Sequence, residues 1–254
     1  MKRHEISEQQ WDRIRDKFPP EKKPQGGQPG KSNRVMLNGI LYWLDMGIPW
    51  RDLPECFEPW QSAYSRFRTW TKAGVWENIL TTLIEQDLVD ETTLMLDSTT
   101  IKVHQHASGV KKGDTTKNPD GAEGLNHESP CGNGWGWESI TFLLSSGNRN
   151  DICMAQALLE SFALNGKLIL ADKGYDSGKF VRCVEERGGI VVIPSRVNAK
   201  HPRNTDWHTY KERHLVENLF LKLKNNRRFA TRYEKKALYF RAVVCLACIF
   251  VWLL

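Results

Sequence analysis

The sequence predicts a small all-helical N-terminal domain over residues 1–90, followed by an α/β domain over residues 91–254. In the first part, apolar side chains recur every three or four residues, which is the period of helices that cover a core. From Thr92 onward, short apolar runs alternate with helical segments, as in α/β domains. The 254 residues are enough to bury a sizeable core.

The N-terminal part is expected to hold four helices, of which the first has Ser7 as a candidate N-cap. They are predicted over residues 6–18, 34–46, 61–72 and 75–86. The Pro/Gly/Lys-rich segment 19–33 is expected to be a loop.

The third helix is the candidate DNA-reading helix of this domain. Its cations Arg66, Arg68 and Lys72 are interleaved with Tyr64, Phe67 and Trp70. Small helical domains place such a helix in the major groove. The alternative is that the aromatic side chains fill the core and the cations only face solvent.

The second part is expected to alternate strands and helices up to a glutamate-bearing helix. Strands are predicted over residues 93–103, 140–144, 167–171 and 189–193, and helices over residues 152–164 and 178–187. A basic loop over residues 194–205 leads into the helix at 210–224. The apolar run 242–254 has 13 residues, too few to span a bilayer, and is expected to be a buried helix.

The helix at 210–224 displays one carboxylate among cations and a phenol. On a regular helix, Tyr210, Arg213, Glu217 and Lys224 fall within roughly 60° of one another. An apolar face lies beside them and would hold the helix on a core. The carboxylate suits a metal ion, and the cations and hydroxyl suit phosphate oxygens. By itself the stripe could equally be an ordinary solvated face.

Two aspartates at predicted strand ends complete a candidate metal site with Glu217. Asp97 ends the apolar run LML, and Asp172 ends the run LILA. Phosphoryl transfer from DNA is served by two Mg²⁺ ions bridged by carboxylates, and Mn²⁺ can replace Mg²⁺ at oxygen ligands. Each aspartate alone could also be a residue that caps a turn.

Charge and cysteine content narrow the class of protein further. The net charge of +6 is uneven, with 13 Lys/Arg against 4 Asp/Glu in residues 195–241, as expected for contact with a polyanion.

Cys245 and Cys248 form a lone C-x-x-C in an apolar run, so reduced buried thiols are expected rather than zinc. His104 and His106 would share one face of an extended strand, but lack further ligands at zinc spacing. Local hydrogen bonding or DNA contact is expected for them. The N-terminus lacks the apolar stretch of a signal peptide.

Several motifs resemble those of the DDE transposases of bacterial insertion sequences, in the insertion-sequence-five family. They are DST followed by HQHASG, then ADKGYDS, VIPSR, YKERHLVENLF, RRFATRY and the apolar tail. The stripe matches the family's Tyr-two-Arg-three-Glu-six-Lys spacing at every position.

The resemblance implies an RNase H-like mixed sheet with flanking helices. It implies Asp97, Asp172 and Glu217 as catalytic metal ligands, and Tyr210, Arg213 and Lys224 at the phosphates near the cut. It also implies double-stranded DNA as partner, both the terminal inverted repeats and the target, bound by a homo-oligomer in a synaptic complex. The N-terminal region would recognise the element ends, in a bacterial cytoplasm at the nucleoid.

Residues 117–139 depart from the family pattern, which has a strand and a GNP turn there. This stretch is rich in Gly and Trp and lacks strand-like alternation. With degenerate codons chosen for it, a back-translation of residues 126–139 read one base later gives TTKVHAVTDGVGNP, a strand and turn of the family type, and the two Trp codons force its glycines. We therefore hypothesise compensating indels, with a true Gly-rich insertion as the alternative. A scrambled partner strand beside Asp97 predicts weak or no activity.

The leading interpretation is a transposase that performs metal-dependent DNA cleavage and strand transfer at element ends. Its competitors are a catalytically inactive DNA-binding relic, a nuclease on the same fold and, more remotely, a zinc hydrolase.

Overall fold

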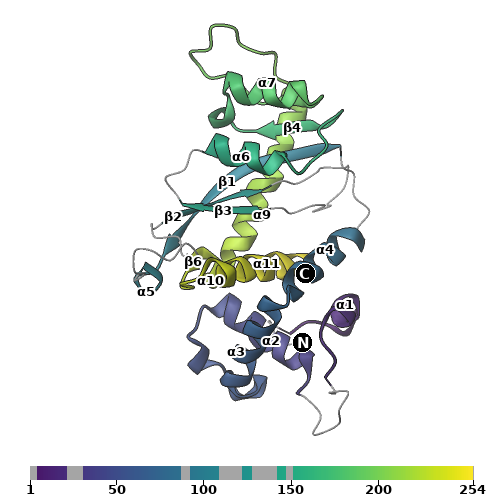
Figure 1. Ribbon diagram of the computed structural model, residues 1–254, viewed down its shortest axis with the longest axis vertical. Coiled ribbons are helices and arrows are strands. Elements are labelled where there is room, and N and C mark those ends of the chain that lie inside the picture. The colour runs from purple at the N-terminus through teal and green to yellow at the C-terminus, as the bar shows by residue number, and fades with distance from the viewer. Residues whose placement is uncertain are drawn as a thin grey trace. The chain divides into compact units, whose positions relative to one another are not determined.

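The computed structural model describes residues 5–21, 31–86, 92–108, 122–127, 142–146 and 151–253 (Figure 1). The chain forms two compact units. The first comprises residues 1–86, 104–117 and 222–254, and the second comprises residues 87–103 and 118–221.

The helices and strands follow the predicted order closely. The described helices are α1 (Glu8–Ile14), α2 (Asn33–Met46), α3 (Trp60–Lys72), α4 (Val75–Gln86), α5 (Gln105–Ser108), α6 (Asp151–Leu159), α7 (Gly178–Glu186), α8 (Trp207–Tyr210), α9 (His214–Asn225), α10 (Arg227–Ala230) and α11 (Ala237–Leu253). The described strands are β1 (Thr93–Val103), β2 (Ala122–His127), β3 (Phe142–Ser146), β4 (Leu168–Ala171), β5 (Ile190–Val192) and β6 (Thr231–Arg232).

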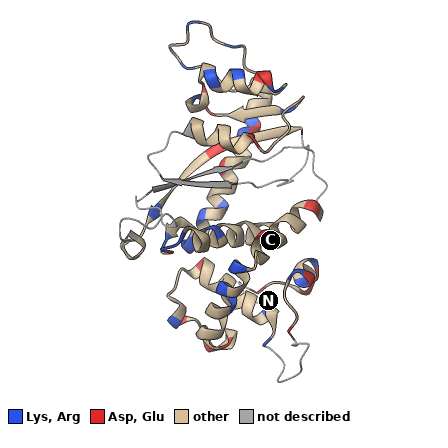
Figure 2. Cartoon of the chain, viewed as in Figure 1, with Lys and Arg blue, Asp and Glu red and all other residues tan. Residues whose placement is uncertain are grey.

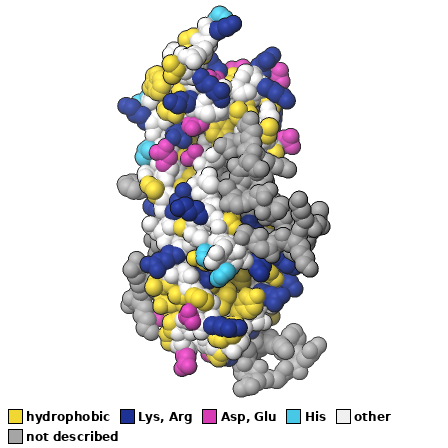
Figure 3. Space-filling model, turned by 90° about the vertical axis from the view of Figure 1, so that its left-hand side faces the viewer, with side chains coloured by type: hydrophobic (Ala, Val, Ile, Leu, Met, Phe, Trp, Pro, Cys, Tyr) yellow, Lys and Arg dark blue, Asp and Glu magenta, His cyan; other side chains and the backbone are white. Residues whose placement is uncertain are grey.

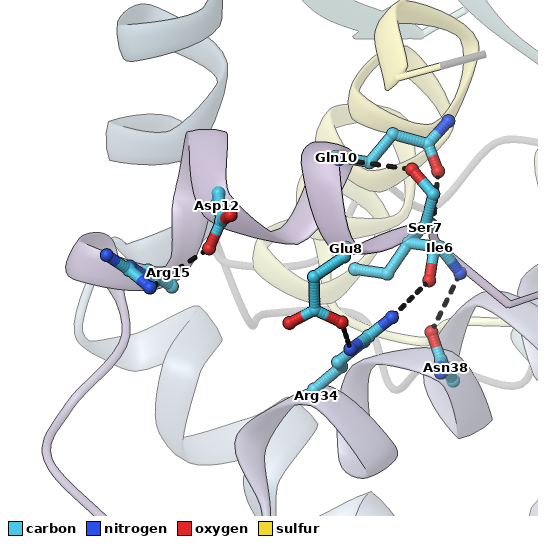
Figure 4. A network of polar contacts seen from close by, with 8 residues as sticks. All are labelled: Ile6, Ser7, Glu8, Gln10, Asp12, Arg15, Arg34 and Asn38. Atoms are coloured by element: carbon cyan, nitrogen blue, oxygen red, sulfur yellow. Dashed lines mark hydrogen bonds and ion pairs between the residues drawn. The ribbon is translucent and has the colours of Figure 1, made fainter.

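The start of α1 shows how local sequence sets an element boundary. Ser7 is its N-cap: the hydroxyl accepts from the Gln10 amide at 3.2 Å, and the Gln10 side chain accepts from the Ser7 amide at 2.6 Å. This reciprocal pair satisfies two donors that a helix start leaves open. Figure 4 shows the pair, with Arg34 of α2 reaching Glu8 and the Ile6 carbonyl. The predicted N-cap is confirmed.

The C-terminal helix is buried, as predicted, and starts earlier than expected, at Ala237. It packs against α4, α2 and α3, so the first compact unit joins the two ends of the chain. A functional division into residues 1–90 and 91–254 remains a prediction. Cys245 and Cys248 lie in this helix as free thiols, and burial raises the pKa of Cys248 to about 12. None of the helices in the described ranges is both long and apolar enough to be a membrane span.

A mixed sheet forms the centre of the second unit, in the strand order β3-β2-β1-β4-β5 (Figure 1). β1 pairs with β4 and β4 with β5 in parallel, whereas β2 is antiparallel to both β1 and β3. Helices α6 and α7 share one apolar core with this sheet. That core contains Leu94, Leu96, Ala155, Leu158, Leu159, Leu164, Ile169, Ala171, Tyr175, Phe180, Val184 and Ile193. The predicted alternation of strands and helices is confirmed.

A strand pairs with β1 beside Asp97, in the stretch where we hypothesised a lost or distorted partner strand. β2 pairs with β1 from Asp97 opposite His127 to Lys102 opposite Ala122. The expectation failed because it rested on side-chain alternation, whereas strand pairing uses backbone groups, and an unpaired edge of β1 would leave those groups unsatisfied. The rest of the departing stretch, residues 117–121 and 128–139, lies outside the described residues.

Two predicted helices need correction. The helix predicted over 152–164 ends at Leu159, where the chain turns. The helix predicted over 210–224 is split into α8 and α9 by a 3-10 turn at Lys211–Arg213. Tyr210, Lys211 and His214 keep right-handed helical dihedral angles, so the chain winds more tightly at this turn but stays helical.

The two histidines do not share an extended strand either. β1 ends at Val103, and His106 lies in α5. The His106 amide donates to Nδ1 of His104 at 3.2 Å, and the His104 ring stacks on Tyr233 at 4.6 Å. The expected local hydrogen bonding is therefore confirmed.

Candidate active site

Asp97 and Asp172 occupy equivalent positions on adjacent parallel strands. Leu96 pairs with Ala171 in the register of β1 and β4; Asp97 is the next residue of β1, and Asp172 directly follows β4 with an extended backbone. Side chains alternate between the two faces of a sheet, so both aspartates point to the face opposite the core that contains Leu96 and Ala171. The sheet itself therefore brings these two predicted ligands together.

Arg213 connects Asp97 to the helix that carries Glu217. Its Nη1 lies 3.6 Å from Oδ1 of Asp97, and its Nη2 is paired with Oε1 of Glu217. The side chains of Arg213 and Asp97 are 17% and 18% exposed, whereas that of Glu217 is 51% exposed. The guanidinium thus lies between two predicted metal ligands, at the place where a cation balances both carboxylates.

The pKa of Asp97 is shifted by several of the same groups. Burial raises the pKa of this carboxyl, while the hydrogen bond from the Ser98 amide and the charge of Arg213 lower it. The carboxylates of Asp172 and Glu217 raise it further, and the net direction is upward. Two other carboxylates therefore act on Asp97, and a divalent cation would relieve this repulsion.

Asp172 is fixed by the turn that follows β4. Its Oδ1 accepts from the Gly174 amide at 2.8 Å and caps the 3-10 turn at Lys173–Tyr175. A Cβ at position 174 would lie only 2.8 Å from that oxygen, so a larger residue there would displace the Asp172 carboxylate. The predicted turn-capping role is thus real, and it also holds the carboxylate at the end of the strand.

The stripe residues that were predicted to bind phosphate, Tyr210, Arg213 and Lys224, are not all in contact with one another. Tyr210 contacts Arg213, whose Cζ lies 6.0 Å from the ring centre. Lys224 is exposed near the end of α9, two turns beyond Glu217. The apolar face predicted beside them is confirmed, because Val216, Leu219 and Leu223 are buried.

The three cations of α3 belong to the other compact unit. Arg68 and Lys72 are on its exposed face, and Arg68 donates to the Tyr239 hydroxyl at 3.3 Å. Arg66 is half-buried, with its Cζ 6.0 Å from the Trp70 ring. Phe67 and Trp70 are core residues, as the alternative interpretation of this helix required. Contact of these cations with DNA remains a prediction.

The residues present fit a divalent metal, although they do not yet enclose one. Among the described side chains, no three of the ligand types His, Cys, Asp and Glu group closely enough to hold an ion as they lie. The donors at the site are all carboxylate oxygens, which Mg²⁺ and Mn²⁺ prefer. Arg213 provides the positive charge between Asp97 and Glu217 that an ion would supply.

Sequence reasoning missed a second polar network in the same unit, centred on Asp176. Oδ2 of Asp176 accepts from the Arg196 amide and Oδ1 accepts from Nη2 of Arg203, both at 2.6 Å. Burial alone would raise the pKa of Asp176, but these two arginines lower it below its ordinary value. The only signal in the sequence was the position of Asp176 four residues after Asp172.

The fold and the site define an α/β protein with acidic residues where the parallel pairing of β1 and β4 ends, although β1 itself continues beyond Asp97 to Val103. Two family models match this chain. One, described as "Putative transposase of IS4/5 family", matches residues 6–80, and the other, "Transposase DDE domain", matches residues 89–252. The chain therefore belongs to the DDE transposases of insertion sequences, in the IS4/5 group. These are enzymes of DNA transposition, which cut DNA and transfer its strands.

Similar proteins agree with this assignment. The chain is 36% identical over 111 residues to the "Putative transposase for insertion sequence element IS6501" of Brucella ovis, covering 42% of this chain and 82% of that protein. It is 34% identical over 120 residues to the "Insertion element IS402 uncharacterized 16.2 kDa protein" of Burkholderia cepacia, covering 43% and 80%.

A solved structure that resembles the fold is the piggyBac transposase in a synaptic complex with hairpin DNA. It has a TM-score of 0.39 and 11% identity, and the match covers 77% of this chain. The chain spans about half (48%) of the length of that structure's chain.

Proposed function

We propose that this transposase cleaves DNA at the ends of its insertion element and transfers the strand to target DNA, with Asp97, Asp172 and Glu217 as ligands of two Mg²⁺ ions. The observation that carries the proposal is that Arg213 pairs with both Asp97 and Glu217, while the charges of Asp172 and Glu217 both act on the Asp97 carboxyl. A homo-oligomer is proposed because two element ends must be joined in one reaction.

We also propose that the second unit is an RNase H-like domain. The strand order β3-β2-β1-β4-β5, with antiparallel pairing on one side of β1 and parallel pairing on the other, supports this assignment. In such a sheet a ligand site is expected near the carboxyl ends of the parallel strands; Asp172 directly follows β4, and Asp97 is the first residue of β1 beyond its parallel pairing with β4.

The chain's own residues would divide the work as follows. Asp97 and Asp172, held by strand and turn, would hold the metal, and Glu217 would join them as a ligand once its ion pair with Arg213 is broken. Bound divalent metal would stabilise the attacking and leaving oxygens of the phosphodiester. Arg213, released from Glu217, then pairs with a DNA phosphate, and Tyr210 and Lys224 bind neighbouring phosphates.

The protein should act on the DNA of its own element and in a metal-dependent way. We expect purified protein to cut duplexes that carry the element's terminal inverted repeat with Mg²⁺ or Mn²⁺, and chelated protein to regain this activity with Mg²⁺ but not Zn²⁺. Equal cutting of duplexes without the repeat would indicate a nuclease. Binding without cutting would indicate an inactive relic. We propose activity because β2, whose loss was the reason to expect impairment, pairs with β1.

Metal binding should also appear as thermal stabilisation that depends on pH. Because the pKa of Asp97 is raised in the folded protein, its ionisation destabilises the fold as pH rises from the ordinary Asp value through the raised one. Above that window the full cost persists unless a metal offsets it. We therefore expect Mg²⁺ to raise the Tm at pH 7.5 by several degrees, and this increase to vanish as pH falls through the raised pKa.

Two isosteric variants provide the control for that measurement. In EDTA at pH 7.5, Asp97→Asn should raise the Tm, by about 2–4 °C for each kcal/mol gained, and should abolish the effect of Mg²⁺. Asp176→Asn should lower the Tm, because the pKa of Asp176 is depressed and its ionised form stabilises the fold above the ordinary Asp pKa. A drop in Tm for Asp97→Asn would contradict the proposed electrostatics.

A further inference from the structure

The loop after β5 is a basic, exposed segment beside the acidic centre. Residues 194–205 contain three Lys/Arg and no Asp/Glu. Arg196, Asn198 and Lys200 are exposed, and Val197 is 94% exposed. Because β5 runs parallel to β4, this loop leaves the sheet at the same edge at which Asp172 ends β4. The neighbouring helix α7 carries both signs of charge, two Lys/Arg and two Glu, as Figure 2 shows.

Asp176 anchors both ends of this loop. It accepts from the Arg196 backbone at the start of the loop and from the Arg203 side chain near its end. Arg203 is tied again, because its amide donates to the Ser195 hydroxyl at 2.9 Å. The six residues between the two arginines therefore form a loop whose base is held by these hydrogen bonds and whose tip is exposed.

The base of the loop is joined to the turn that carries Asp172. Nη2 of Arg196 donates to the Gly174 carbonyl at 3.0 Å, and its Nε lies 3.4 Å from the Lys173 carbonyl. Gly174 is also the residue whose amide holds the Asp172 carboxylate. One short turn thus positions both a predicted metal ligand and the basic loop.

The charge of this loop exceeds what its anchor requires. Asp176 balances one of the two arginines, so the loop retains about two positive charges with Lys200. On the face drawn in Figure 3, Lys and Arg side chains are exposed at the end of the second unit where α7 lies. A DNA strand is a polyanion that extends beyond the phosphate being cut, and such a surface next to the cut site would bind it.

We propose that residues 196–203 form a phosphate-binding loop that holds the DNA strand next to Asp172, and that Asp176 is the positioning residue that fixes this loop. The proposal rests on the function proposed above. Lys200 at the exposed part of the loop binds a phosphate, whereas Arg196 and Arg203 keep the loop in place.

The first test measures duplex binding by fluorescence anisotropy in EDTA, over a range of salt concentrations. Lys200→Ala should weaken binding equally for different sequences and reduce the salt slope by about 0.9, the value for one phosphate contact. Lys200→Arg keeps the charge and should keep the slope. Asn198→Ala changes the same loop without changing charge and should match the wild type. A Lys200→Ala slope equal to that of the wild type would overturn the proposal.

The second test asks whether Asp176 affects DNA binding by positioning the loop or only through its negative charge. Asp176→Asn removes a negative charge, which by itself would strengthen DNA binding. If Asp176 positions the loop, this variant should instead bind DNA more weakly and with a smaller salt slope. Trypsin should cut it faster after Arg196 and Lys200 than it cuts the wild type, and DNA should protect both sites in the wild type. Stronger binding, or unchanged cutting, would overturn the role of Asp176.

A different measurement tests the underlying function. If the wild-type protein cuts no repeat-bearing DNA with Mg²⁺, the proposed function is wrong. If the wild type binds DNA but the loop variants do not change binding as expected, the loop proposal is wrong.

Discussion

Glu217→Gln is expected to abolish DNA cleavage while leaving DNA binding nearly unchanged. The change keeps the shape of the side chain but removes the charge by which Glu217 would hold metal opposite Asp97 and Asp172. Metal stabilisation of a phosphoryl transition state is worth several kcal/mol, and each 1.36 kcal/mol is a factor of ten in rate. The cleavage rate should therefore fall by at least about 10³-fold, measured in single-turnover reactions on end-labelled DNA.

The matched control is Glu212→Gln, which changes the same charge five residues earlier in the same helical segment. Five residues correspond to a rotation of about 140°, so Glu212 faces away from the stripe. This variant should cut at a rate within a few-fold of the wild type. If both variants cut normally, Glu217 is not a ligand. If Asp97→Ala changes neither DNA affinity nor any other property, the protein acts only by binding.

Arg228→Met is expected to cause the largest loss of stability. Arg228 is only 7% exposed, and its Cζ lies 4.6 Å from the ring centres of both Trp43 and Tyr233. Its Nη2 donates to the Ile48 carbonyl, and its Nη1 lies 3.8 Å from the buried carboxylate of Glu234. Removing one partner of a buried pair costs about 3–5 kcal/mol, because the other charge stays buried. A decrease in Tm of about 6–20 °C should follow.

Two further variants identify the cause of that loss. Arg227→Met changes the preceding, exposed arginine and should lower the Tm little. The double variant Arg228→Met with Glu234→Gln removes both charges and should regain part of the lost stability, because the Glu234 carboxylate is no longer buried without Arg228, although buried Arg232 loses the charge of Glu234 as well. A double variant as unstable as the single one would show that packing of Arg228 on Trp43, rather than its charge, is decisive.

The carboxylates could be predicted from the sequence because each follows from a local pattern. Asp97 and Asp172 directly follow apolar runs, and parallel strands bring equivalent ends to one edge of a sheet. The helical period placed Arg213 and Glu217 on one face. The same reasoning failed for β2, where strand pairing depends on backbone groups that the side-chain pattern does not report.

The sequence by itself determined the order of the elements, the faces of their helices and three of the residues proposed for catalysis. These follow from patterns among residues that are close together in the chain. Only the tertiary structure revealed Arg213 between Asp97 and Glu217, Asp176 at the base of the basic loop, and Arg228 beside Glu234. It also decided that the C-terminal helix packs with the N-terminal helices. Contacts of this kind join segments far apart in the chain or depend on side-chain geometry, so they leave no periodic pattern in the sequence.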